Sequence, residues 1–295
     1  MPAPTHRVFS LGRIAAIAAN TLTELTRLRV FYALLIFALI LIGSSIFMAR
    51  LTFQQELQVL KDISLGAMSI FTSLLAIVGT ARLLPQDIEE RTVYTILAKP
   101  VARFEYLAGK LCGVLMLLAI SVGLMTVLFS IVLFFREQSV LAETTLQMAG
   151  LPADQLSEAI RSVRASAFSA NLLPGIGAIY LKGCLLASLT LFISTFATSN
   201  IFTVVVAMVV YFIGHLQATA REFWLLEQGG GPFSRTFLAV VALLFPDLQL
   251  FDLADEAVLG TVIPFALFLK TVALGCFYVV LYLLLAVVVF AGREL

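Results

Sequence analysis

The sequence predicts an all-α, polytopic membrane protein that folds as a single domain over residues 1–295, with six transmembrane helices. One observation is composition, because 61% of the residues are hydrophobic and only 13% are charged. A typical soluble domain carries about 25% charged residues, and a soluble chain with so little charge would expose large apolar patches. The other observation is that the apolar residues gather in runs of roughly 20, the length that crosses a bilayer as a helix.

Six apolar segments are long enough to cross or nearly cross a bilayer. The predicted spans are about 30–49, 63–84, 107–135, 176–197, 201–217 and 264–290. The third is longer than one crossing needs, so we expect it to tilt or to extend beyond the membrane. A seventh apolar piece, FLAVVALLF at 237–245, ends before Pro246 after nine residues. At about 1.5 Å per residue it covers less than half of the hydrocarbon core, so we expect a re-entrant or interfacial half-helix before the last span.

The segment before the first span, residues 8–29, has the periodicity of an amphipathic helix. Apolar residues recur every three or four positions on one face, namely Leu11, Ile14, Ala18, Leu22 and Leu25. Charged residues such as Arg13 and Arg27 fall on another face. A helix of this kind suits the plane of the membrane interface, in contact with lipid, better than a crossing. The alternative is a short cytosolic helix that packs on a partner, and in neither case is the segment a secretory signal peptide.

Six crossings put both termini on one side of the membrane, and we expect that side to be the cytoplasm. With this orientation the inner segments hold ten of the 19 basic residues and six of the 18 acidic residues. The positive-inside rule favours the arrangement, since the inner segments are both basic and short. The sequence thus predicts a multi-pass protein of the cytoplasmic (inner or plasma) membrane, with extracytoplasmic segments at 136–175 and 218–263.

The most charged passage of the chain is PQDIEERTVYTILAKPVARFEYLAGK, residues 85–110. Pro85 suits the first turn of a helix, and the acidic residues after it favour the positive end of the helix dipole. Lys99 and Pro100 predict the end of the helix, because a residue that precedes Pro avoids helical geometry. The pattern predicts a cytoplasmic helix over 86–98 with two halves. One half is apolar, and the other, free to meet another protein, carries the charged and aromatic residues Asp87, Glu90, Arg91 and Tyr94. The alternative is a solvated loop whose charges keep it out of the lipid.

The stretch DIEERTVYTILAKPVARFEYLAGK resembles the first cytoplasmic loop of permease subunits of ABC-2 type ATP-binding-cassette transporters. In that family an acidic–Glu–Arg cluster precedes a Pro turn, an Arg, and a Gly-Lys pair that opens the third span. The matching positions here are Glu89, Glu90, Arg91, Pro100, Arg103, Gly109 and Lys110. The N-terminal helix, the six spans and the short broken helix also fit that family, and the nitrous-oxide-reductase maturation permeases are the subgroup most similar in layout.

The resemblance implies a permease subunit that works in export, as a dimer with a second copy or a paralogue, alongside a separate ABC ATPase. The 86–98 helix would be the coupling helix, the 8–29 helix the elbow helix, and the pieces around FLAVVALLFPDLQLFDL the extracellular half-helices. Residues implied in ATPase coupling are Asp87, Glu89, Glu90, Arg91, Tyr94, Lys99 and Arg103. ATP and Mg would bind to the ATPase and no cofactor to this chain, which has no G-x-x-x-x-G-K-[S/T] phosphate loop.

Lys182 and Lys270 are the ionisable residues most nearly within the predicted spans, and they are the candidate charges of a translocation path. Both lie within about two turns of the expected outer end of a span, where a lysine can snorkel to the interface. The alternative is that they line a cavity or pair with an acid, for which the candidates are Asp252, Asp255 and Glu256.

Other residues exclude several classes of function. Cys112, Cys184 and Cys276 lie far apart and form no CxxC pair, and His6 and His215 are expected on opposite sides of the membrane, so no metal site is indicated. A net charge of +1 gives no case for nucleic-acid binding. A membrane metalloprotease needs clustered His, which disfavours an enzyme. The remaining alternatives are a membrane scaffold subunit and a secondary transporter, which would need buried charges near the midplane.

Overall fold

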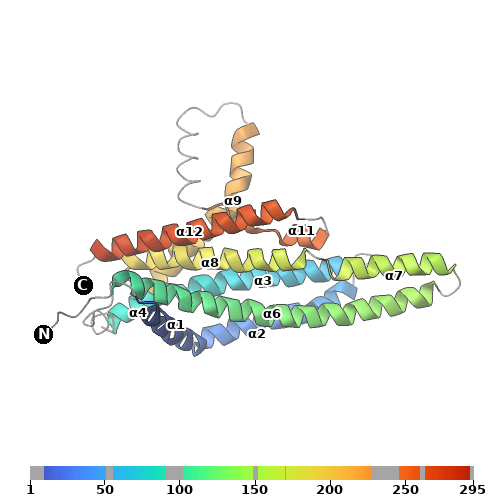
Figure 1. Ribbon diagram of the computed structural model, residues 1–295, viewed down its shortest axis with the longest axis horizontal. Coiled ribbons are helices and arrows are strands. Elements are labelled where there is room, and N and C mark those ends of the chain that lie inside the picture. Colours follow the sequence, from blue (N-terminus) through green and yellow to red (C-terminus); the bar gives the residue numbers. More distant parts are fainter. Residues whose placement is uncertain are drawn as a thin grey trace.

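The computed structural model describes residues 10–50, 56–90, 102–148, 152–169, 171–226, 246–259 and 263–292. Within these ranges all regular secondary structure is helical, which confirms the predicted all-α class. Among the described residues, six helices are long and apolar enough to cross a membrane, and the chain is a multi-pass membrane protein. Figure 1 shows most of them running side by side along the long axis of the molecule, while α9 leaves the bundle.

Each predicted span falls on one of these helices, with the second running from α3 into α4. The elements are α1 (Leu11–Thr26), α2 (Arg29–Arg50), α3 (Glu56–Ala81), α4 (Leu83–Glu89), α6 (Arg103–Gln147), α7 (Ala153–Ala167), α8 (Leu172–Phe196), α9 (Asn200–Leu226), η1 (Leu248–Phe251), α11 (Ala254–Leu259) and α12 (Phe265–Gly292). These segments form helices because, in lipid, a helix satisfies every backbone N–H and C=O within its own segment. The half-helix predicted at 237–245 lies outside the described residues.

The helices divide into inner and outer ones. In the spans that contain α3 and α8, 72% of the most apolar window is buried inside the protein, against 22% in α2, α9 and α12. Helix α8 is the central element, because it contacts α3, α6, α9 and α12. The outer helices present long apolar side chains such as Phe37, Val205 and Val288, as expected of a surface that faces lipid.

Helix α6 is far longer than one crossing. Its 45 residues extend about 68 Å, over twice the hydrocarbon core. Beyond the predicted span it continues to Gln147, and α7 packs back against it, so the described part of 136–175 is largely a helical hairpin (Figure 1). At the base of this hairpin the buried Arg136 forms an ion pair with Glu56 of α3. Lys61 of α3 donates a hydrogen bond of 3.0 Å to the carbonyl of Ser166 in α7, so the hairpin is fastened to the bundle.

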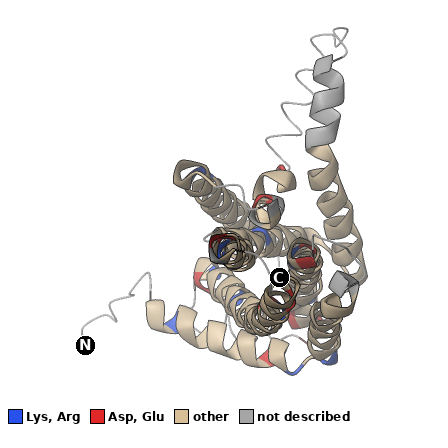
Figure 2. Ribbon diagram, turned by 90° about the vertical axis from the view of Figure 1, so that its right-hand side faces the viewer, with Lys and Arg blue, Asp and Glu red and all other residues tan. Residues whose placement is uncertain are grey.

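Helix α1 lies crosswise to the helices that Figure 2 shows end-on. It packs on α6 at two glycines, where the backbones approach closely. A Cβ added to Gly109 would lie 2.7 Å from Cβ of Ile17, and one added to Gly113 would lie 2.6 Å from Cβ of Thr21. The small residues, four positions apart, therefore form the docking groove for α1. Leu11 at the start of α1 is 72% exposed, so part of the predicted apolar stripe remains free for lipid.

The start of α1 and the end of α12 lie at the same end of the bundle, as an even number of spans requires (Figure 1). Arg103, at the start of α6, donates hydrogen bonds to the carbonyls of Phe290, at 3.0 Å, and Ala291, in the last turn of α12. This end, which holds Ser10, Glu90 and Gly292, is called the terminal end below. The opposite end, with the α6–α7 hairpin, is called the hairpin end.

Candidate functional site

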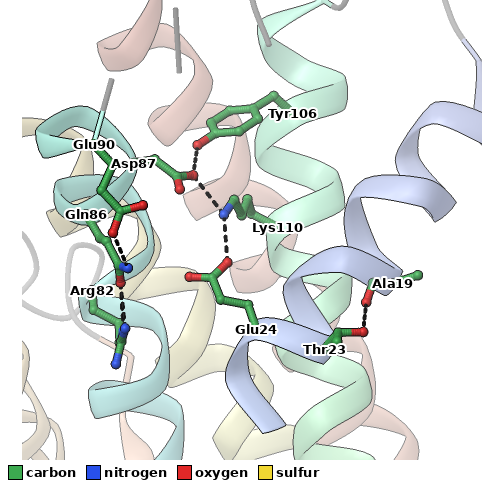
Figure 3. A network of polar contacts seen from close by, with 9 residues as sticks. All are labelled: Ala19, Thr23, Glu24, Arg82, Gln86, Asp87, Glu90, Tyr106 and Lys110. Carbon is green, nitrogen blue, oxygen red and sulfur yellow. Dashed lines mark hydrogen bonds and ion pairs between the residues drawn. The ribbon is translucent and has the colours of Figure 1, made fainter. Parts of the chain in front are cut away.

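Four polar side chains from three helices converge at the terminal end, and Figure 3 shows them pointing toward one another. They are Glu24 of α1, Asp87 of α4, and Tyr106 and Lys110 of α6, and together they are called the terminal network. The Lys110 Nζ lies 2.7 Å from Oδ2 of Asp87 and 3.4 Å from Oε2 of Glu24. The Tyr106 hydroxyl donates a hydrogen bond to Asp87. One ammonium thus joins carboxylates from two other helices.

The terminal network is shielded from solvent, which strengthens its internal contacts. The Lys110 side chain is 4% exposed and that of Asp87 is 10% exposed, whereas Glu24 is 25% exposed. A buried ion pair is favourable only when its geometry is good and further hydrogen bonds satisfy the charges. Asp87 meets that condition through Tyr106, whose ring also stacks on Phe290 of α12 at 6.1 Å. The network therefore links α1, α4, α6 and α12 at one point.

Asp87 was expected on the exposed half of the coupling helix, and that prediction is wrong because its side chain is buried in the terminal network. The helix also begins earlier than the predicted residue 86. Pro85 has no N–H to donate to the carbonyl of Ala81, so the chain turns at Arg82 and α4 starts at Leu83.

The shifted start of α4 changes where its acids lie. Asp87 and Glu89 fall in the last turn of α4 instead of the first, and Glu90 is the C-terminal cap. A carboxylate there faces the negative end of the helix dipole, and for Asp87 the ammonium of Lys110 offsets this. Arg91, Tyr94 and Lys99, with the rest of the coupling helix predicted to end at 98, lie outside the described residues.

The outer side of α4 carries a second set of contacts that reaches solvent. The Arg82 guanidinium donates to Oε1 of Gln86 at 2.6 Å, and the Gln86 amide donates to Oε1 of Glu90 at 2.7 Å (Figure 3). Successive members are four residues apart, so they lie on one face of the helix. Glu89 and Glu90 are both exposed. The terminal end therefore presents two carboxylates on a helix whose opposite side is fixed to the core.

Glu105, which was not among the predicted site residues, is fully buried between α1 and α6. Its carboxylate accepts hydrogen bonds from the backbone N–H of Ser10 at 2.6 Å and of Ala102 at 3.3 Å. It also lies 3.3 Å from Nε of Arg13. One carboxylate therefore caps the first turns of two helices. A Glu at the third position of a helix can accept from the backbone N–H of the residue before the helix, as Glu105 does from Ala102, and that position is the sequence signal that could have found it.

Lys182 has a different environment, near the middle of the bundle. It lies ten residues after Leu172 and fourteen before Phe196, so it is about 15 Å from the start of α8. Its Nζ is 3.5 Å from Oδ2 of Asp252 and 3.2 Å from Oγ of Ser69 in α3. Because the residue is only 1% exposed, it does not snorkel to an interface, and the predicted alternative, pairing with an acid, is confirmed.

Asp252 reaches Lys182 because the segment 246–259, called the η1–α11 segment, folds back beside α8, α9 and α3. A Cβ added to Gly214 of α9 would lie 2.7 Å from Cγ of Leu248, so the backbones are close there. The Gln249 amide donates to the carbonyl of His215 at 2.9 Å. The Asp252 side chain remains 35% exposed, so the pair joins the interior to the surface.

Lys270, the other predicted path charge, is exposed near the start of α12. Among the described residues it takes no part in an ion pair or hydrogen bond, unlike Lys182. Arg103 was predicted to couple to an ATPase. In the structure its guanidinium donates a hydrogen bond to the backbone carbonyl of Phe290 at the end of α12. Within the described part of the chain no cluster of His, Cys, Asp and Glu could hold a metal ion.

The fold and these sites define a multi-pass helical membrane protein, with a braced terminal end and a charge pair deep within the bundle. The sequence matches no protein-family model, and no curated protein is significantly similar to it. The functional proposal therefore draws on the geometry of these two sites and on the residues of the charged loop.

Proposed function

We propose that this chain is the membrane-spanning permease subunit of an ABC-2 type ATP-binding-cassette transporter. The observation that carries the proposal is the pair of exposed carboxylates, Glu89 and Glu90, on a helix whose inner side is fixed to α6 by Asp87 and Lys110. A soluble motor needs a charged feature that it can bind and that does not move independently of the membrane bundle. The charge pattern of residues 85–110 supplies that feature.

In this proposal ATP and Mg²⁺ bind to a separate ATPase subunit, and this chain performs no covalent chemistry. Closure of the ATPase pushes the 86–98 region, and the Asp87–Lys110 contact passes the displacement to α6. Glu24 passes it to α1 as well, because Lys110 holds both carboxylates. The long α6 then carries the movement toward the hairpin end. Packing changes between this chain and a second permease copy or paralogue, and substrate is exported.

The proposal places the terminal end in the cytoplasm of the cell, in the inner or plasma membrane, with both termini on that side. The crosswise α1, with its exposed Leu11, would lie at the lipid interface as an elbow helix. The η1–α11 segment would lie toward the exterior half of the bundle. The resemblance to nitrous-oxide-reductase maturation permeases remains a narrower proposal of the same kind.

The test is co-purification of this chain with candidate ABC ATPase subunits from the same cell. Reversing both charges with Glu90→Lys and Arg91→Glu should abolish co-purification, or leave an ATPase whose hydrolysis no longer responds to this chain. The matched control is Glu158→Lys with Arg161→Glu on the exposed face of α7, at the hairpin end. That pair should leave the complex intact. Retention of the ATPase by the first variant at the native level contradicts the proposal.

A secondary transporter is a second candidate, and the buried contact between Lys182 and Asp252 favours it. Ionisable groups at membrane depth are typical of proteins that couple transport to an ion gradient. Proteoliposomes that contain this chain alone, under an imposed proton or sodium gradient, separate the two candidates. Dissipation of the gradient that depends on Lys182 and needs no ATPase selects the secondary transporter. An intact gradient gives the secondary transporter no support.

A further inference from the structure

The turn between α1 and α2 carries two exposed arginines. Arg27 is the C-terminal cap of α1, and Arg29 is the first residue of α2. Within the described part of the chain, neither side chain takes part in an ion pair or a hydrogen bond. The acid closest to them in the sequence, Glu24, lies 3.4 Å from Nζ of Lys110. The turn therefore presents two positive charges to its surroundings.

Other basic side chains differ from this pair in their surroundings. At the terminal end the other described ones contact groups of this chain, namely Arg13, Arg82, Arg103 and Lys110. On the hairpin, Arg161 and Arg164 are exposed as well, but α7 also carries two acids, so the charge of that helix sums to zero. Among the described residues, the α1–α2 turn is thus the place where two neighbouring cations lack an acid.

Helix α2 shows where the turn lies relative to the lipid. Its apolar run over 30–49 extends about 30 Å as a helix, which is the thickness of a hydrocarbon core. Arg29 comes immediately before that run, so it lies at the level of the lipid headgroups. Tyr32, one turn further along α2, is 51% exposed, and tyrosine is enriched at this boundary between hydrocarbon and water.

The exposed side of α2 begins at the same arginine and continues into the hydrocarbon. Ala33, Ile36 and Ile40 follow Arg29 at the spacing of one helix face, and all three are exposed. The most apolar window of α2 is only 22% buried inside the protein, so this face is open to lipid. From Arg29 to Ile40 the helix rises about 16 Å, which is close to the depth of one leaflet. A phospholipid chain can therefore lie along α2 while its headgroup reaches the turn.

We propose that Arg27 and Arg29 bind the phosphate of an anionic phospholipid in the leaflet at the terminal end, and that its acyl chain lies on the exposed face of α2. Guanidinium groups bind phosphate oxygens through paired, charge-assisted hydrogen bonds. A zwitterionic headgroup fits less well, because its ammonium would lie close to the two arginines. The lipid would hold the turn at which α1 joins the bundle. This inference goes beyond the proposed function and does not rest on it.

The test uses the full chain in dodecyl maltoside micelles, with dioleoylphosphatidylglycerol and dioleoylphosphatidylcholine as probes that differ only in the headgroup. Native mass spectrometry gives the Kd of the first lipid bound. Phosphatidylglycerol should bind at least tenfold more tightly, since each basic residue near anionic headgroups contributes about fivefold. Arg27→Gln with Arg29→Gln should reduce this preference to less than about twofold. The matched control, Arg161→Gln with Arg164→Gln on α7, removes the same charge and should keep the full preference.

A charge-conserving variant separates charge from damage to the fold. Arg27→Lys with Arg29→Lys changes the same positions and should keep most of the preference for phosphatidylglycerol. A Lys pair that loses the preference as fully as the Gln pair overturns the proposal, and so do equal preferences in the Gln pair and the α7 control. A native chain that binds both lipids equally also overturns it, and the arginines would then face another partner, such as an acidic protein segment.

A competitor distinguishes a lipid from a free phosphate compound. Glycerophosphoglycerol, the headgroup without its acyl chains, should leave phosphatidylglycerol bound at equal concentration, because it cannot use the exposed face of α2. Displacement at equal concentration would show that the site takes a soluble phosphodiester, and would overturn the lipid assignment. None of these measurements contains an ATPase, so a failed co-purification leaves the lipid result intact, and a failed lipid test leaves the ATPase association intact.

Discussion

The terminal network and the Lys182 site are both lysine–carboxylate contacts inside the protein, but they differ in what holds the acid. At the terminal end Asp87 lies 2.7 Å from Lys110, is 10% exposed, and also accepts a hydrogen bond from Tyr106. Deeper in the bundle Asp252 lies 3.5 Å from Lys182 and is 35% exposed. The first acid is enclosed by three helices, and the second lies on a short segment and is partly exposed.

This difference indicates two mechanical roles for the same chemistry. A closely paired and hydrogen-bonded ion pair resists separation, because removing one partner leaves an uncompensated buried charge. A pair whose acid is partly solvated separates at lower cost, because water stabilises the released carboxylate. We therefore interpret the terminal network as a joint, and the Lys182–Asp252 pair as a contact that separates at lower cost.

The largest expected effect is that of Lys110→Met at the joint. The substitution leaves Asp87 buried without its cation and releases Glu24 of α1. It should lower the free energy of unfolding by about 3–5 kcal/mol, as removal of one partner from a buried pair does. Denaturant unfolding in mixed micelles measures this. The control is Lys270→Met, expected within about 0.5 kcal/mol of the native chain. A loss at Lys110 no larger than that of the control would show that the network is not a joint.

The next effect concerns the groove in which α1 docks. Gly113→Ala places a Cβ within 2.6 Å of Thr21 Cβ and 2.8 Å of the carbonyl of Ala18, so α1 must move. Overpacking of this kind costs about 1–3 kcal/mol. The matched control is Gly123→Ala on the same helix, where a Cβ would have nothing within 4 Å. Its unfolding free energy should be unchanged or higher, and equal losses for both variants would contradict close packing of α1.

A smaller effect is expected from Tyr106→Phe, which removes only the hydroxyl that donates to Asp87. A hydrogen bond to a charged group contributes about 1.5–3 kcal/mol. We expect a loss near the lower limit, since Lys110 still pairs with Asp87. Tyr32→Phe on the exposed face of α2 is the control and should be neutral in the same unfolding assay. A neutral result at Tyr106 would assign the whole stability of the joint to Lys110.

The smallest effect belongs to the outer side of α4. Gln86→Ala breaks the contacts that link Arg82 to Glu90, but these side chains are partly or wholly in solvent. Pairs four residues apart on a helix surface contribute about 0.2–0.5 kcal/mol each. Unfolding should therefore change by less than about 1 kcal/mol, since two such contacts are lost. A loss comparable to that of Lys110→Met would mean that the exposed face, and not the buried one, fastens α4.

The spans could be predicted from sequence because each depends on a local property, a run of apolar residues long enough to cross lipid. The amphipathic α1 could be predicted for the same reason, since its periodicity is local. The direction of Asp87 could not, because the face of α4 that turns inward is set by packing against α6, where Lys110 and Tyr106 hold the carboxylate.

The Lys182 site could be predicted only as one of two alternatives. Lys182 and Asp252 are 70 residues apart in the sequence, and no local pattern indicates that the η1–α11 segment folds back to α8. The depth of Lys182 was also underestimated, because α8 begins at Leu172, before the apolar run expected from 176. Glu105 was not predicted as a site residue, because its hydrogen bond from Ser10 joins segments 95 residues apart.

A pair of double-mutant cycles tests most directly the claim that the Asp87–Lys110 contact is a joint and that the Lys182–Asp252 pair separates at lower cost. The first cycle combines Asp87→Asn with Lys110→Met, and the second combines Asp252→Asn with Lys182→Met, each read out as the free energy of unfolding. The account predicts a coupling energy at the terminal network that exceeds the coupling at the Lys182 site by at least about 1.4 kcal/mol, a tenfold difference in equilibrium constant. Equal coupling energies, or a larger one between Lys182 and Asp252, would contradict it.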